Sequence, residues 1–161
     1  MVMEENPDYP CCYTDEIWIR RGKRVNPRKK HAKYSGWIYN RCLPLCIISP
    51  SSVMLRRGIF EQIGFFDEAF PVCEDYDLWL RLTARYPVFF IEKPLIMKRG
   101  GHDDQLSSRN WGNDIYRVKA IEKMLQMGVR VEQQALAKHG LEFVARTYLP
   151  NKLKNTGAFL P

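Results

Sequence analysis

Long apolar runs are missing from this sequence of 161 residues. A helix that crosses a membrane needs about 18–20 consecutive apolar residues, and the best stretch, residues 43–48, is short and contains a proline. The first eight residues carry Glu4, Glu5 and Asp8 in place of the basic and apolar regions of a signal peptide. We therefore expect a soluble, cytoplasmic chain, at most peripheral to the inner face of a membrane.

Histidine is scarce, with three residues, and the five cysteines are not arranged as two close-spaced pairs. A tetrahedral zinc site is usually built from two such pairs. We therefore expect reduced, mostly buried thiols and no zinc site. Repeats and low-complexity tracts are also absent, and a hydrophobic content of 45% supplies material for the core of at most one domain.

Acidic residues are absent from residues 17–41, which hold nine lysines and arginines and leave 16 basic against 18 acidic residues elsewhere. A local excess of this kind predicts a polyanionic neighbour: nucleic acid, a phosphorylated lipid head group or a nucleotide diphosphate. A solvated loop is the plainer alternative. Aromatic residues are interleaved with these charges and suit stacking on bases or packing against sugar rings; they are Trp18, Tyr34, Trp37 and Tyr39.

The spacing of apolar residues predicts a mixed α/β chain. We expect strands at 12–19, 47–55, 88–92 and 95–98, a short helix at 35–41, a single helical turn at 59–63, and helices at 74–86, 113–127 and 132–148. Gly64 closes the single turn, and Gly140 interrupts the last helix. These strands are too few for a complete nucleotide-binding sheet.

Three carboxylates, those of Glu74, Asp75 and Asp77, fall in the first turn of the helix expected at 74–86. Acids at this position commonly answer the partial positive charge of a helix N-terminus. Asp75 and Asp77 also form a D-x-D sequence, but residues two apart on a helix point in nearly opposite directions. We therefore do not interpret this pair as a metal motif.

The runs 48–57, 60–68, 74–81 and 101–107 together resemble the C-terminal half of family 2 glycosyltransferases. The resemblance implies part of a GT-A, Rossmann-like domain: a short mixed sheet with flanking helices and a C-terminal helical tail. Residues 1–110 would form the acceptor-side half of that domain, and residues 111–161 a helical extension.

The resemblance also implies roles for individual residues in an inverting transfer of sugar. Glu74 and Asp75 match the catalytic pair, in which Asp75 is the general base. Gly64 and Phe65 match the loop that shapes the acceptor pocket. Trp79 and Arg81 match helix positions near the acceptor, and His102 matches a histidine near the metal and the pyrophosphate.

The partners that the resemblance implies are a nucleotide-sugar donor and a saccharide or lipid-linked acceptor, with peripheral contact to an anionic membrane and no nucleic acid. The cofactor would be a divalent cation, Mg²⁺ or Mn²⁺, held mostly by a donor-binding half that this sequence lacks, so we expect the chain to be inactive alone. Two alternatives remain open. One is a non-catalytic basic module that binds nucleic acid or anionic lipid, and the other is a helper of a separately encoded donor half.

Overall fold

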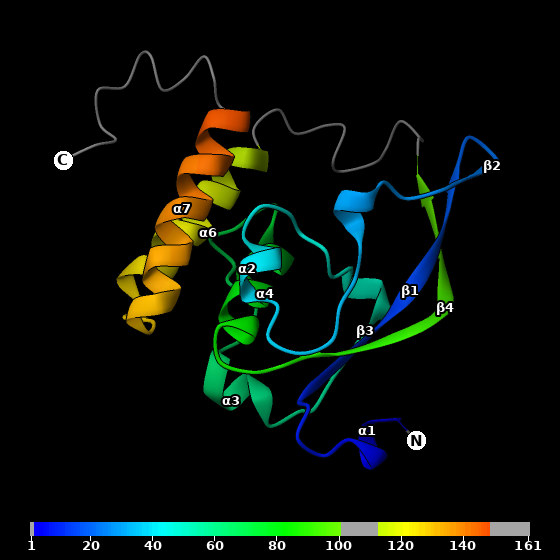
Figure 1. Cartoon of the computed structure of the whole chain (residues 1–161), viewed down its shortest axis with the longest axis horizontal. Coiled ribbons are helices and arrows are strands. Elements are labelled where there is room, and N and C mark those ends of the chain that lie inside the picture. Colours follow the sequence, from blue (N-terminus) through cyan, green and yellow to red (C-terminus); the bar gives the residue numbers. More distant parts are fainter. Residues whose placement is uncertain (1, 101–112, 149–161) are drawn as a thin grey trace.

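The computed structural model describes residues 2–100 and 113–148. A sheet lies at one side, α2 and α4 lie in the middle, and α6 packs beside α7 at the other side (Figure 1). The elements in chain order are α1 (Val2–Glu5), β1 (Cys11–Arg20), β2 (Lys23–Val25), the 3₁₀ turn η1 (Lys29–His31), α2 (Tyr39–Cys42), the 3₁₀ turn η2 (Pro50–Ser52), β3 (Val53–Leu55), α3 (Ile59–Ile63), α4 (Glu74–Thr83), β4 (Phe89–Gly100), α6 (Asn113–Gln126) and α7 (Val131–Tyr148).

The sheet is short and mixed, as the sequence predicts, and β1 is its centre. β1 pairs antiparallel with β2 and β3 and parallel with β4. The expectation of two strands at 88–92 and 95–98 is wrong, because β4 is one strand. The register against β1 shifts at Asp15, opposite Pro94. A proline has no N–H to give to the ladder, so it is accommodated at an irregularity while pairing continues on both sides.

Helix α4 is buried on every side from Tyr76 to Thr83, because α2, α3 and α6 all pack against it. The apolar residues Leu78, Trp79 and Leu82 lie in the core, as their spacing predicts. The expectation that Asp77 and Arg81 fall on an outer face is wrong, since both are buried and bonded to each other.

Helix α7 is continuous, although the sequence predicts an interruption at Gly140. Gly140 is buried against Leu43, the residue after α2, and a Cβ atom built at Gly140 would lie 2.9 Å from the Leu43 Cβ. The glycine is therefore a point of close approach within the helix. It lets α7 lie directly against the segment that follows α2.

Across residues 2–100 and 113–148, no helix combines the length and the apolar character that membrane crossing requires. All five cysteines are free, and Cys11, Cys12 and Cys42 are buried.

Candidate functional site

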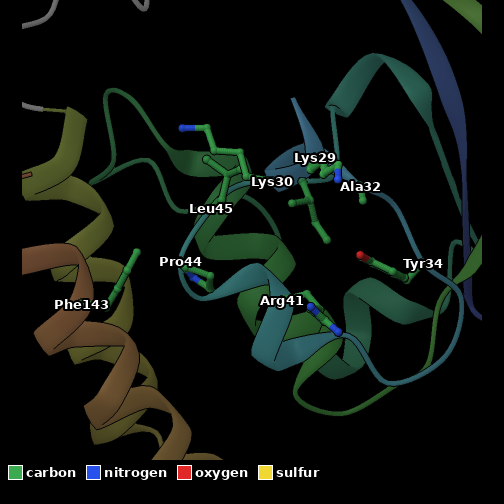
Figure 2. Close-up of a pocket in the computed structure, with 9 residues that line it drawn as sticks. Lys29, Lys30, Ala32, Tyr34, Arg41, Pro44, Leu45 and Phe143 are labelled. Carbon is green, nitrogen blue, oxygen red and sulfur yellow. The ribbon is translucent and has the colours of Figure 1, made fainter. Parts of the chain in front are cut away.

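The basic segment borders a pocket of about 290 Å³ between α7 and the chain that surrounds α2 (Figure 2). Among the residues that the structure describes, none with a carboxylate lines it. Three cations stand beside apolar and aromatic side chains, and the lining is Lys29, Lys30, Ala32, Tyr34, Arg41, Pro44, Leu45, Ile47 and Phe143. The pocket therefore combines a positive potential with an apolar floor.

Tyr34 is fixed in this pocket through its backbone. Its N–H donates to the Tyr13 hydroxyl at 2.9 Å, and that hydroxyl donates to the Tyr34 carbonyl at 2.8 Å. Tyr13 belongs to β1 and is fully buried, and burial raises the pKa of its hydroxyl, which keeps the proton that the second bond needs. The Tyr34 side chain is 40% exposed, with the Arg41 guanidinium 4.9 Å from its ring centroid.

Residues 27–34 form a wall between this pocket and a second one of about 100 Å³. Lys30, Ala32 and Tyr34 line the first pocket, while His31 and Lys33 line the second. Side chains that alternate along an extended segment point to opposite sides. The basic segment is thus an ordered partition with two differently lined faces.

A buried ion pair anchors the wall to β1. Lys33 Nζ lies 2.7 Å from Glu16 Oε1 and also donates to the Thr14 carbonyl at 2.8 Å. Trp18 donates its indole N–H to the other oxygen of Glu16 at 2.9 Å. Burial alone would raise the pKa of Glu16, but the hydrogen bonds from Lys33 and Ser49 and the nearby lysine charges outweigh it and lower the pKa.

We expect Glu16 to make stability depend on pH. A carboxyl whose pKa is lowered by folding stabilises the fold fully above its unfolded pKa, here about 4.5, and loses that contribution as the pH falls through the lower folded value. Urea unfolding of the wild type and of Glu16→Gln, followed from neutral pH to about pH 3, should show the difference shrinking below about pH 4.5. A difference that stays constant over this range would contradict the assignment.

The surface around the pocket extends along α7 and the turn before it. Phe143 of α7 is 46% exposed, and it lies less than one helical turn beyond Gly140, which sets the position of the helix. Trp37 is 58% exposed, with the Arg130 guanidinium 5.7 Å from its ring centroid. The aromatic and basic surface is therefore assembled from two distant parts of the chain.

Glu74 and Asp75 lie at the start of α4, where the sequence places them. Glu74 is exposed. Asp75 is half-buried, and burial raises the pKa of its carboxyl even though one oxygen accepts the N–H of Tyr76 at 2.7 Å. Its other oxygen lies 3.8 Å from Cys46 Sγ. Neither residue lines the basic pocket.

The structure gathers Gly64, Phe65 and Arg81 in one place. Arg81 is buried and donates to the carbonyls of Ile63 and Phe65, so it fixes the loop backbone. Gly64 has φ +77°, and a Cβ there would lie 3.3 Å from Arg81 Nη1. The exposed Phe65 ring stacks on Phe60 with the centroids 5.1 Å apart.

Trp79 is enclosed in the core, 1% exposed, and does not reach the surface. His102 lies outside the described residues. Among residues 2–100 and 113–148, no three His, Cys, Asp or Glu side chains gather closely enough to hold a metal ion. This part of the chain does not fit a metal centre.

Comparison with known protein families leads away from the glycosyltransferases. Residues 97–153 match the Toprim domain of topoisomerase 6A/Spo11. The match covers about a third of the chain, including α6, α7 and therefore Phe143. The mixed α/β arrangement is consistent with a Rossmann-like Toprim fold.

Curated relatives carry the same description. The type 2 DNA topoisomerase 6A of Methanocaldococcus jannaschii is 58% identical over 43 residues, covering 27% of this chain and 12% of that protein. The corresponding protein of Pyrococcus horikoshii is 47% identical over 51 residues, 32% of this chain and 13% of that protein. The matched region is thus about an eighth of the length of these relatives. No solved structure shows a significant match.

A Rickettsia felis protein described as an uncharacterized glycosyltransferase is 38% identical over 69 residues, 42% of this chain and 11% of that protein. The chain therefore shows local similarity to two kinds of protein. Only the topoisomerase similarity is accompanied by a matching family model.

The identification as a glycosyltransferase is therefore wrong, and with it the GT-A assignment, the sugar-transfer activity, the nucleotide-sugar and acceptor partners and the exclusion of nucleic acid. The roles of Glu74, Asp75, Gly64, Phe65, Trp79, Arg81 and His102 were implied by that resemblance alone. Toprim domains bind divalent metal ions such as Mg²⁺, so a divalent cation is compatible with the match, although for a different reason from the one that led us to expect it.

Sequence reasoning singled out the basic segment but missed Phe143 as a neighbour. Phe143 falls on a helix more than a hundred residues from Lys29 and Lys30. The available signal was Gly140, since a glycine inside an otherwise regular helix often marks close packing.

Proposed function

We propose that this chain binds nucleic acid through the basic surface around Tyr34. The observation that carries the proposal is the pocket itself: Lys29, Lys30 and Arg41 stand around an aromatic and apolar lining, to which the described parts of the chain add no carboxylate. Cations bind phosphates, and aromatic side chains beside them add contacts to the bases.

The similarity to topoisomerase 6A supports the same function, since those relatives are named as DNA topoisomerases. The matched region supplies α7 and one wall of the pocket, while residues 29–47 supply the remainder. DNA is therefore the polyanion that we infer for this surface.

We expect the chain to bind fluorescent DNA with an affinity that falls steeply as salt increases from about 50 to 200 mM, because each neutralised phosphate releases counterions. Lys29→Gln and Lys30→Gln should each weaken binding uniformly across sequences and make the slope of log K against log salt shallower by about one. Fluorescence anisotropy titrations at several salt concentrations would measure both effects.

Arg57→Gln is the matched control, because Arg57 is an exposed cation just before α3 and does not line the pocket. It should leave the affinity and the slope nearly unchanged. An absence of salt-dependent binding by the wild type, or equal slopes for all four proteins, would overturn the proposal.

A further inference from the structure

We propose that the pocket between α7 and residues 29–47 accepts one unstacked base, so that the ligand of this surface is single-stranded nucleic acid. The inference deepens the nucleic-acid binding proposed above and rests on it. It assigns Phe143 to the faces of the base, Tyr34 to its edge, and the three cations to the flanking phosphates.

The lining matches the chemistry of a base. Pro44, Leu45, Ile47 and Phe143 present apolar surface, which suits the flat faces of an aromatic heterocycle. The Tyr34 hydroxyl points into the pocket, where it is placed to exchange a hydrogen bond with a polar base edge (Figure 2). A volume of about 290 Å³ is at the small end of the range of about 300–1,000 Å³ in which pockets hold small ligands.

Charges stand beside this apolar space. Lys29, Lys30 and Arg41 are exposed, so their nitrogens can meet phosphates on either side of an inserted base. A lining whose described residues bring cations and no carboxylate favours a ligand that is negative outside its ring system. A nucleotide within a strand has this combination of flat apolar faces and flanking negative charge.

A duplex does not present its bases in this way. Its stacked bases cover one another's faces, and only their edges reach the grooves. To place a base beside Phe143, a duplex would have to flip it out, which costs a few kcal/mol of stacking and pairing. A single strand has much less to lose, so the pocket should favour single strands over duplexes of the same length.

The pocket is formed before the ligand arrives. Two hydrogen bonds to Tyr13 hold the Tyr34 backbone, Arg41 covers one face of its ring, and the contact of Gly140 with Leu43 holds α7 in place. Preformed contacts reduce the entropy that binding must offset. The base is therefore received by rigid groups.

We expect Phe143→Ala to weaken binding to a single-stranded oligonucleotide by at least about 5-fold, because stacking of a base on an aromatic ring contributes about 1–3 kcal/mol. Its duplex affinity and its salt slope should stay as in the wild type, since no cation is lost. Anisotropy titrations of both ligands would show the split. Leu136→Ala is the matched control, because Leu136 is a similarly exposed apolar residue on α7 and does not line the pocket.

A second measurement uses the wild type alone. A single strand carrying abasic sites keeps its phosphates but has no bases to insert, so it should bind at least about 5-fold more weakly than the complete strand. Equal binding of the abasic and complete strands, or an unchanged affinity of Phe143→Ala, would overturn base insertion while leaving the salt-dependent binding intact. Failure of every DNA to bind would instead overturn the proposed function.

Discussion

Replacing Asp77 with alanine should destabilise the protein by about 3–5 kcal/mol, the usual cost of removing one partner of a buried ion pair. Asp77 is completely buried and accepts from Arg81 Nε at 3.0 Å and from Arg81 Nη2 at 2.7 Å. The Lys123 ammonium approaches the same carboxylate at 3.0 Å. Without Asp77, the buried Arg81 guanidinium would lose its counterion. Urea unfolding monitored by circular dichroism would measure the loss.

Asp67→Ala provides the control within the same network. Asp67 binds Lys123 at 2.7 Å, but both side chains are about a third exposed to solvent. Partly exposed pairs contribute about 0–1 kcal/mol, so this variant should lose much less stability. Similar losses for Asp67→Ala and Asp77→Ala would show that burial does not decide the strength of this network.

Replacing Gly140 with leucine should destabilise the protein by about 3 kcal/mol, the upper end of the usual range for overpacking. Even the first side-chain atom would lie 2.9 Å from the Leu43 Cβ, and Leu43 is itself buried. The strain can be relieved only by moving α7 away, and Phe143 moves with it. We therefore expect a lower melting temperature and weaker binding of single strands together.

Ala135→Leu controls for the new side chain. Ala135 lies on the exposed side of the same helix, and leucine is a good helix former, so stability should change by less than about 0.5 kcal/mol. A neutral Gly140→Leu variant would mean that α7 is not held by its contact with Leu43.

The elements that local patterns specify were predicted closely. The helical turn at 59–63 ends at Gly64 as expected, and β1 and α6 fall within one residue of their predicted bounds. Each of these has its signal within its own residues: a cap, an apolar alternation or a helical period. Such signals need no knowledge of the rest of the chain.

Features that depend on distant partners were not predicted. Asp77 can be buried because Lys123, 46 residues further along, joins Arg81 beside it. The pocket depends in the same way on Phe143 meeting a segment near residue 30. The basic run itself was visible in the sequence, but its partner in forming a site was not, because only the packing of α7 brings the two together.

The partition formed by residues 27–34 has one more consequence. Its Lys33 is clamped to the buried end of a carboxylate in the centre of the sheet, while its Lys30 and Tyr34 face the proposed ligand. One backbone therefore carries both the anchor and the contact surface. The grip on a ligand and the integrity of the sheet are mechanically joined, so a change that frees the anchor in β1 should be felt at the opposite face without touching it.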